Sequence, residues 1–152
     1  MATIDAGDDA PDFTLATDRG EQVQLSAALR NGPVVLIFYP MDNTPGCTAQ
    51  LCAVRDDGAR YAAANVTVWG INNAGASSHA GFAQKHGFSA PLLVDEDLRV
   101  AKQYDALAGL GPLRFIKRTV VGIEPSGKIV FYKRGSPSTD EILRVVDPAP
   151  AP

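Results

Sequence analysis

One cysteine, Cys47, stands at the predicted start of a helix, where a thiol can act as a nucleophile. It follows an apolar, β-branched and aromatic run, 34–39, which predicts a fully buried strand of the kind found in parallel sheets. A helix is then expected over about 45–63, with Thr44 as its N-cap and Pro45 at its first position. The unpaired backbone N–H groups and the helix dipole in that first turn favour a thiolate, which is the nucleophilic form of cysteine.

The alternative for Cys47 is a packing role, because free cysteine is among the most buried residue types. That role suits an arbitrary intracellular cysteine. Cys47 differs in its position, directly after a predicted strand-to-helix turn and three residues after a threonine. We therefore expect a reactive thiol.

The composition limits the class of protein. A chain of 152 residues that is 45% hydrophobic and 20% charged predicts one globular domain with a real core. The net charge is −3 and no basic stripe is present, so nucleic acid is not an expected partner. No apolar run approaches the roughly 20 residues of a membrane span, so no membrane partner is expected either.

The compartment and the absence of cofactors follow from similar arguments. The segment 1–12 is acidic and lacks the charged and apolar regions of a signal peptide. Two cysteines without such a signal indicate a reducing, cytoplasmic compartment, where a cysteine pair is more often catalytic or metal-binding than structural. His79 and His86 lack the spacing typical of zinc ligands, so neither a metal nor another cofactor is expected.

The order of predicted elements indicates an α/β protein with helices on both faces of a sheet. The segments 12–16 and 22–25 alternate apolar with polar residues and predict an N-terminal β-hairpin. Ser26 is the predicted cap of the short helix that follows. The other expected elements are strands at 66–72, 91–94, 119–123 and 128–133, helices at 27–30, 77–86, 97–104 and from Ser138 or Thr139 to about 146, and a loop at 107–113.

We expect one domain over residues 1–146. The segment 147–152 alternates proline and alanine and predicts a disordered tail.

The residues around Cys47 resemble a known family motif. Pro40, Thr44 and Cys47 follow the pattern Pro-x-x-x-Thr-x-x-Cys of peroxiredoxins. The string 42–47, with Cys52 five residues after Cys47 and Arg55-Asp56 beyond it, resembles the Q-type branch, also called bacterioferritin comigratory proteins.

The resemblance covers about residues 8–146, although its specific motifs lie in 40–56 and 118–133. It implies a thioredoxin-like fold of the peroxiredoxin type, with a central mixed sheet flanked by helices and an N-terminal β-hairpin. It also implies a monomeric peroxidase that reduces a peroxide substrate and is recycled by thioredoxin or a glutaredoxin-like dithiol reductant.

Several residues acquire roles from this resemblance. Cys47 resembles the peroxidatic cysteine, whose thiolate attacks the O–O bond and is left as sulfenic acid. Thr44 and the backbone N–H groups of the first turn are candidate donors to the leaving oxygen, although Thr44 could serve only as a helix cap. Pro40 shapes the turn and shields the thiolate, or simply ends the strand.

Arg118 matches the arginine that comes close to the cysteine in the family. Its charge would stabilise the thiolate, and its planar guanidinium would hold a peroxide oxygen. Without the resemblance we would expect a solvated surface charge.

Cys52 resembles the resolving cysteine of the Q-type branch. On a regular helix, residues five apart are separated by a rise of about 7.5 Å and a turn of about 140°. Their Cα atoms then lie roughly 8–9 Å apart, beyond the ~7 Å limit for a disulfide. A Cys47–Cys52 bond therefore requires the first helical turns to unwind. The alternative is that Cys52 is packed and inert, and that an external thiol attacks Cys47 directly.

Other polar residues near the motif receive weaker interpretations. Gln50 either holds a backbone or arginine contact or is exposed helix surface. Arg55 and Asp56 are expected to brace the helix by ion pairing, without a catalytic role. His79 and His86 are expected at the surface.

The chain departs from the family pattern at two places. Gly122 stands where a bulky apolar residue is usual, and the segment 107–115 is shorter and richer in glycine. Both departures concern the surroundings of the site, and they leave the catalytic residues unchanged. Trp69, in the middle of a predicted strand, is expected in the core.

Two other functions compete with the thiol peroxidase. A thiol–disulfide oxidoreductase acting on proteins normally uses Cys-x-x-Cys, and the wider spacing here suits that exchange badly. A non-enzymatic redox sensor would be oxidised once without turnover. Peroxide consumption in a coupled thioredoxin system distinguishes all three.

Overall fold

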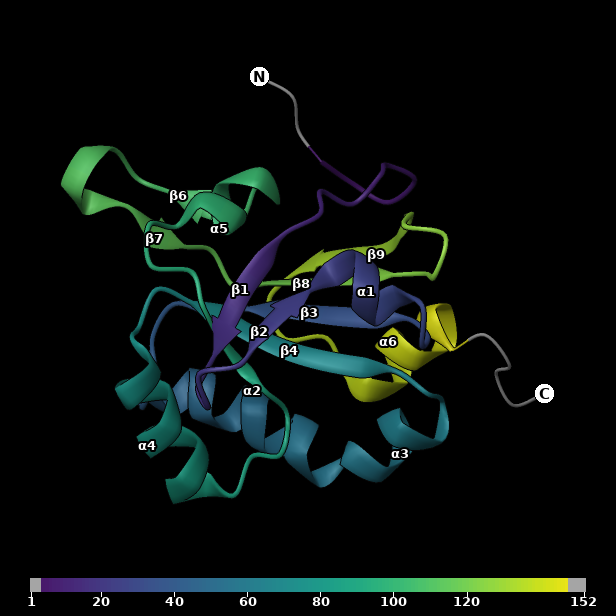
Figure 1. The fold of residues 1–152 in the computed structure, drawn as a ribbon, viewed down its shortest axis with the longest axis horizontal. Helices are drawn as coiled ribbons and strands as arrows, with labels where there is room; N and C mark the ends of the chain where they lie inside the picture. The colour runs from purple at the N-terminus through teal and green to yellow at the C-terminus, as the bar shows by residue number, and fades with distance from the viewer. Residues whose placement is uncertain (1–3, 148–152) are drawn as a thin grey trace.

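A computed structural model describes residues 4–147, so the predicted tail at 147–152 lies outside the described residues except for Asp147. Its centre is a seven-stranded mixed sheet in the order β2-β1-β5-β4-β3-β8-β9 (Figure 1). The strands are β1 Thr14–Thr17, β2 Gln22–Gln24, β3 Val34–Phe38, β4 Thr67–Asn72, β5 Leu92–Val94, β6 Leu107–Ala108, β7 Phe115–Ile116, β8 Thr119–Ile123 and β9 Ile129–Arg134. The helices are α1 Leu25–Leu29, α2 Pro45–Asp56, α3 Gly58–Ala63, α4 Ala76–His86, α5 Arg99–Gln103 and α6 Thr139–Val146, with a 3₁₀ turn at Gly111–Leu113.

The central strand β3 confirms the prediction of a fully buried strand. All five of its residues are buried, and it pairs parallel with β4 and antiparallel with β8. The N-terminal hairpin is also confirmed, because β1 pairs antiparallel with β2 and joins the sheet through β5. The expected α/β fold with a central mixed sheet is therefore present.

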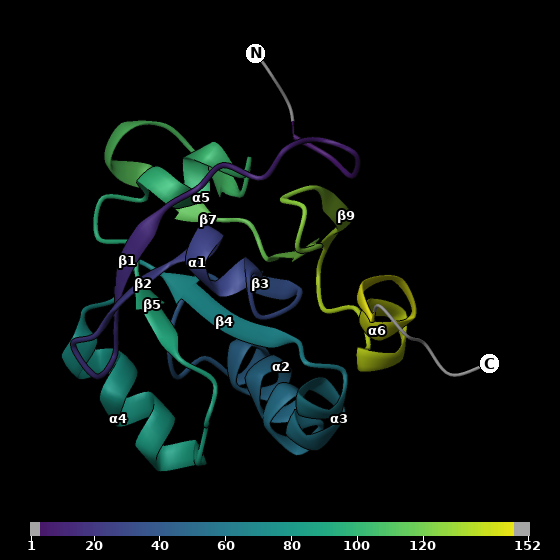
Figure 2. The same ribbon diagram turned by 45° about the vertical axis from the view of Figure 1, so that its right-hand side comes forward.

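Helices lie on both faces of the sheet (Figure 2), and an apolar cluster fills the space on each face. Since side chains alternate along a strand, Val34, Leu36 and Phe38 of β3 enter one cluster, and Val35 and Ile37 enter the other. The first cluster packs under α1 and α5, and the second under α2, α4 and α6. Trp69 lies in the first cluster with 3% of its surface exposed, as expected.

The helix expected over 45–63 is divided into α2 and α3 at Asp57. The backbone of Asp57 leaves the helical conformation, with φ −95° and ψ 12°, and Gly58 follows with its low helix propensity. The Asp57 carboxylate accepts a hydrogen bond from the Thr139 hydroxyl at 2.5 Å, which ties this break to the start of α6. The prediction of one continuous helix was wrong.

Two shorter predictions also need correction. Gln24, not Ser26, occupies the N-cap position of α1, and the Ser26 hydroxyl donates instead to the Asp12 carboxylate at 3.0 Å. The segment expected as a loop contains β6 and the 3₁₀ turn, and β6 pairs with β7 in a separate two-stranded sheet. In both segments, contacts between residues that are not neighbours in the sequence determine the local structure.

Gly122 has a packing explanation. A Cβ atom at this position would lie 2.6 Å from Cγ2 of Val146 and 3.0 Å from Cβ of Phe131. The absence of a side chain therefore lets α6 lie directly against β8, so the small residue is a requirement of helix–sheet packing.

None of the helices within residues 4–147 has the length and apolarity needed to cross a membrane.

Candidate active site

Cys47 lies in the first turn of α2, as the sequence predicts. Asn43 adopts the left-handed region with φ 65°, which asparagine tolerates well, and reverses the chain after β3. Thr44 then holds the N-cap position with extended backbone, and Pro45 opens the helix. Cys47 is 1% exposed and belongs to the apolar cluster beneath α2.

Arg118 directly precedes β8, the strand that pairs with β3, and its side chain reaches the sulfur of Cys47. Its Nη2 donates to Cys47 Sγ at 3.2 Å, and its Nη1 donates to Gln50 Oε1 at 2.7 Å. Gln50 is itself buried and donates weakly to the carbonyl of Gly135 at 3.4 Å. The expected approach of Arg118 to Cys47 is confirmed. Of the two interpretations of Gln50, the arginine contact is confirmed, and an exposed position on the helix is wrong.

Gly46 makes room for this arginine. A Cβ atom on Gly46 would lie 3.2 Å from Arg118 Nη2, tighter than an ordinary contact. The guanidinium therefore packs over the backbone of the first helical turn, with one edge on Gln50 and one nitrogen on the sulfur. The positive charge of Arg118 is therefore held directly beside the sulfur.

Thr44 and Pro40 occupy the expected turn, but Thr44 does not cap the helix with its side chain. Its hydroxyl donates to the carbonyl of Met41 at 3.2 Å. Pro40 is half-buried at the bend where β3 ends. Thr44 is thus an N-cap by position only, and its hydroxyl is held by a single weak neutral contact.

Cys52 lies further along the same helix and is half-buried, and both cysteines are free thiols. Because α2 is regular from Pro45 to Asp56, the spacing argument against a direct Cys47–Cys52 bond applies to this conformation. Arg55 pairs with Asp56 at 2.9 Å, as predicted, and also donates to the carbonyl of His86 at 2.6 Å. That second contact ties α2 to the end of α4.

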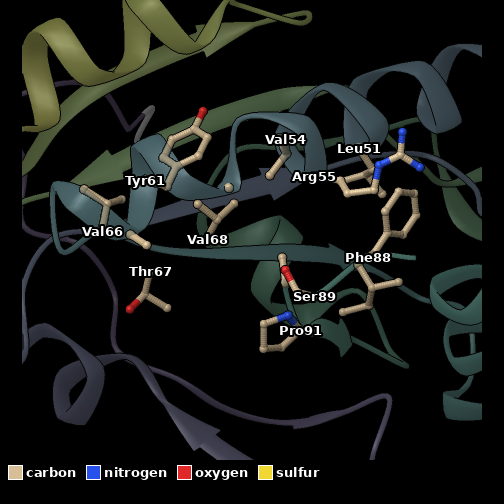
Figure 3. A pocket seen from close by; sticks show the side chains of 14 residues that line it. Leu51, Val54, Arg55, Tyr61, Val66, Thr67, Val68, Phe88, Ser89 and Pro91 are labelled. Atoms are coloured by element: carbon tan, nitrogen blue, oxygen red, sulfur yellow. The ribbon is translucent and has the colours of Figure 1, made fainter. Parts of the chain in front are cut away.

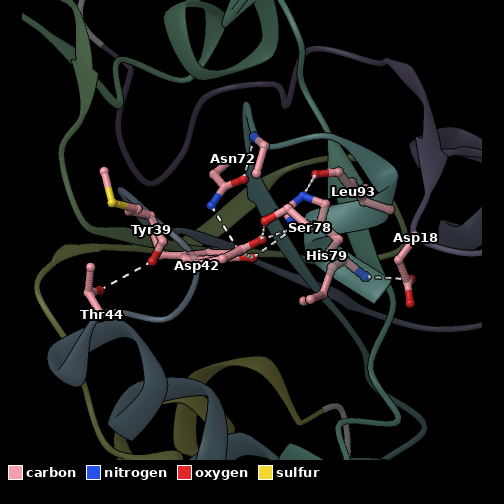
Figure 4. Close-up of polar contacts among 11 residues, drawn as sticks. Asp18, Tyr39, Asp42, Thr44, Asn72, Ser78, His79 and Leu93 are labelled. Atoms are coloured by element: carbon pink, nitrogen blue, oxygen red, sulfur yellow. Dashed lines mark hydrogen bonds and ion pairs between the residues drawn. The ribbon is translucent and has the colours of Figure 1, made fainter. Parts of the chain in front are cut away.

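A buried polar network lies around the turn that leads from β3 into α2 (Figure 4). Asp42 Oδ1 accepts from the Tyr39 hydroxyl at 2.6 Å and from Asn72 Nδ2 at 3.2 Å. Asp42 Oδ2 accepts from the Ser78 hydroxyl at 2.7 Å and lies 2.8 Å from His79 Nδ1. Although burial raises the pKa of Asp42, the hydrogen bonds from His79, Tyr39 and Ser78 bring it below its ordinary value.

His79 corrects the sequence analysis, which placed it at the surface. The residue is completely buried, and its Nε2 lies 2.9 Å from the carbonyl of Leu93. Helical spacing contained the signal, since His79 shares a face of α4 with Phe82 and Ala83, both of which are buried. His86 is half-buried, with its ring stacked on Phe88 at 5.6 Å between centroids.

A separate apolar cavity of about 220 Å³ lies on the inner side of α2 and α3, away from the sulfur of Cys47 (Figure 3). Leu51 and Val54 of α2 line it, together with Val68 and the loop 88–91. Since Cys47 and Arg118 are not among its lining residues, the cavity is not the reaction site.

Comparisons with known proteins agree with this arrangement. Residues 6–132 match the model of the AhpC/TSA family. A protein of Coxiella burnetii provisionally named peroxiredoxin bcp is 37% identical over 131 residues, which cover 84% of this chain and 86% of that protein. The chloroplastic peroxiredoxin Q of Triticum aestivum is 44% identical over 101 residues, which cover 66% of this chain and only 46% of the wheat protein.

Solved structures show the same fold. The peroxidoxin BcpB of Mycobacterium tuberculosis has a TM-score of 0.89 and 32% identity, covering 96% of this chain and 98% of that one. The bacterioferritin comigratory protein of Xanthomonas campestris has a TM-score of 0.80 and 25% identity, covering 91% and 92%.

The sheet, the cysteine at the start of α2 and the family match define a thioredoxin-like thiol enzyme. The chain belongs to the AhpC/TSA family and, within it, to the peroxiredoxins of the Q or Bcp type, and it is a peroxidase.

Proposed function

We propose that Cys47 is the peroxidatic residue and that the enzyme reduces hydrogen peroxide and organic hydroperoxides. The observation that carries this proposal is the 3.2 Å contact from Arg118 Nη2 to Cys47 Sγ in the first turn of α2. The described part of the chain contains one other cysteine, Cys52, and it lies away from any helix start. The Xanthomonas relative has alkyl peroxide reduction activity, which supports including organic hydroperoxides as substrates.

In the first step the Cys47 thiolate attacks the terminal oxygen of ROOH. An S–O bond forms and the O–O bond breaks, so that sulfur is oxidised to sulfenic acid and the peroxide is reduced. The leaving RO⁻ takes up a proton to become an alcohol, or water when R is hydrogen. Thr44, Arg118 and the N–H groups of the first turn are the proposed donors to the reacting oxygens, and Pro40 shields the thiolate from bulk water.

In the second step the Cys52 thiol attacks the Cys47 sulfenic acid. A disulfide forms and water leaves, provided that α2 has unwound. A dithiol reductant of the thioredoxin or glutaredoxin type then reduces the disulfide by thiol–disulfide exchange. We further propose a monomer working in the reducing cytoplasm, where a dithiol reductant would be available.

The test is peroxide consumption coupled to thioredoxin and thioredoxin reductase, with the chain as isolated. Cys47→Ser is expected to abolish consumption. Cys52→Ser is expected to form sulfenic acid, detected by a dimedone adduct, but to turn over slowly. Full coupled activity in Cys52→Ser would remove the resolving role, and full activity in Cys47→Ser would remove the peroxidatic one.

The same assay addresses the two competing functions. Insulin reduction without peroxide consumption would indicate a protein oxidoreductase. One equivalent of oxidation without turnover would indicate a redox sensor.

A further inference from the structure

A buried charged pair, Asp42 and His79, holds the turn in front of Cys47. Asp42 is 7% exposed and His79 is fully buried, and they come from the turn after β3 and from α4. The carboxylate accepts four hydrogen bonds, two on each oxygen, from four different residues. Asn72 lies on β4, Ser78 and His79 lie on α4, and Tyr39 directly follows β3, so a single carboxylate joins these segments to the turn.

The contacts of His79 define its protonation state. Nε2 faces the Leu93 carbonyl, which can only accept, so Nε2 carries a proton. Nδ1 faces Asp42, whose carboxylate already takes three other donors and is therefore ionised, so Nδ1 also donates. The two acceptors therefore suit a ring that carries a proton on each nitrogen, with the carboxylate compensating its charge.

This pair is connected to the sulfur through Tyr39. The Tyr39 hydroxyl donates to Asp42, and its ring lies in the same apolar cluster as Cys47. Gly70 provides the space for that ring, because a Cβ there would lie 3.1 Å from Tyr39 Cε1. The turn is therefore held at Asp42, and Tyr39, which Asp42 binds, lies in the same buried cluster as Cys47.

We propose that Asp42 and His79 are positioning residues for peroxide reduction. Their ion pair holds the 40–44 turn in the conformation that presents Thr44 and Cys47, and its compensated charge keeps the turn insensitive to pH near neutrality. The proposal rests on the proposed role of Cys47. Neither side chain contacts the reacting atoms, so their effect is exerted through the turn.

The groups that face the pair identify what can titrate. Tyr39, directly after β3, contacts both members of the pair, with its hydroxyl 3.4 Å from His79 Nδ1. Cys47 of α2 and Asp18 of the β1–β2 turn act electrostatically on Tyr39, while Ser78 and Asn72 are neutral. Burial, followed by the charge of Asp42, raises the pKa of Tyr39, so the phenol stays neutral. When the carboxylate is removed, the histidine is therefore the group within the network that can change its charge.

Asp42→Asn removes the negative charge but keeps the size and shape of the side chain. The amide oxygen can still accept from Tyr39, and its NH₂ can donate to Nδ1 of a neutral His79, so the network can remain hydrogen-bonded at alkaline pH. On acidification, any proton taken up by the ring would face an amide donor and lack a compensating carboxylate. Asp42→Ala removes the acceptors altogether.

The experiment measures the second-order rate of Cys47 oxidation by hydrogen peroxide in single-turnover stopped flow. Asp42→Ala is expected to be slower by about 10- to 100-fold at every pH, because small displacements of reacting groups have effects of this size. The rate ratio of Asp42→Asn to the parent protein is expected to fall about tenfold between about pH 8 and about pH 5.5. Nitrogen-15 NMR should show both His79 nitrogens protonated in the parent at neutral pH.

Asp95→Asn is the matched control. Asp95 is also fully buried, but it accepts from the N–H groups of Val100 and Ala101 at α5, on the other face of the sheet. Its rate ratio should stay constant over the same pH range.

A constant ratio for Asp42→Asn, or a neutral His79 in the parent, would overturn the proposal. Full activity in Cys47→Ser would instead remove the proposed function, so the two failures are distinguishable. If Asp42→Ala does not fold, the pH dependence of the Asp42→Asn rate ratio still tests the proposal.

Discussion

Arg118 Nη2 lies 3.2 Å from Cys47 Sγ, although 71 residues separate the two along the chain. The contact exists because β3, which leads to Cys47, pairs antiparallel with β8, which begins directly after Arg118. The Phe38–Thr119 pair brings the end of one strand beside the start of the other. The sheet register therefore assembles the site.

Removal of the Arg118 guanidinium is expected to slow peroxide attack. A hydrogen bond to a charged group contributes about 1.5–3 kcal/mol, which corresponds to about 10- to 100-fold in rate for Arg118→Ala. Arg118→Lys should restore only part of it, because lysine keeps the charge but lacks the planar fork that also binds Gln50. The measurement is the stopped-flow rate of sulfenic acid formation.

Lys117→Ala is the control for that substitution. Lys117 is adjacent in sequence, and its ammonium lies 3.9 Å from Asp105, away from Cys47. Its rate should equal that of the parent. An Arg118→Ala protein that reacts as fast as Lys117→Ala would place Arg118 outside the reaction.

Oxidation is expected to unwind α2 and to leave α3 folded. The two thiols cannot meet on the regular helix, and the break at Asp57 gives the unwinding a natural limit. Several helical hydrogen bonds are lost, each worth about 0.5–1.5 kcal/mol, together with the Arg55 contact to His86. The reduced form should then be the more thermally stable one, the reverse of the usual effect of a disulfide.

Amide hydrogen exchange on the two redox forms measures this. Loss of protection should be confined to about residues 44–56. Peroxide-treated Cys52→Ser, which can form no internal disulfide, serves as the control and should keep its protection. Equal exchange in a verified intramolecular disulfide form would contradict the mechanism.

The Asp42 carboxyl is expected to stay ionised below its ordinary pKa of 3.8, because His79, Tyr39 and Ser78 donate to it and outweigh the effect of burial. A folded pKa below the unfolded value means that the carboxylate stabilises the fold above about pH 3.8. That contribution is lost as the pH falls through the lower folded value. Carbon-13 NMR of the carboxyl group against pH gives the midpoint, with Asp42→Asn assigning the signal. A midpoint above 3.8 would show that burial prevails.

Gly122→Ala is expected to destabilise the protein by about 1–3 kcal/mol, the usual cost of overpacking a core. The added Cβ would meet Val146 and Phe131 and push α6 away from β8. Urea unfolding of the reduced protein gives the difference. Val146→Ala in the same chain removes the atom at 2.6 Å and should recover part of the loss. An unchanged stability would mean that α6 shifts freely.

Gly81→Ala is the control for this substitution. It lies on an exposed face of α4 with nothing near the added atom, so the free energy of unfolding should not fall.

Local sequence patterns determined several elements of this protein and the position of Cys47. The unbroken apolar run at 34–38, the proline after Thr44 and the glycine after His86 each specify structure through contacts within a few residues. The placement of Cys47 in the first turn of a helix follows from the same short-range rules. For that reason β3, β8 and the start of α2 agree with their predicted positions.

Tertiary contacts decided the rest. The division at Asp57 depends on Thr139, and the burial of His79 depends on a carboxylate 37 residues earlier. The size of residue 122 depends on a helix near the C-terminus. Sequence periodicity shows which face of an element is apolar, but a polar side chain on that face can be buried only where a partner satisfies its hydrogen bonds. The identity of that partner is set by how the elements pack, and only the folded chain shows it.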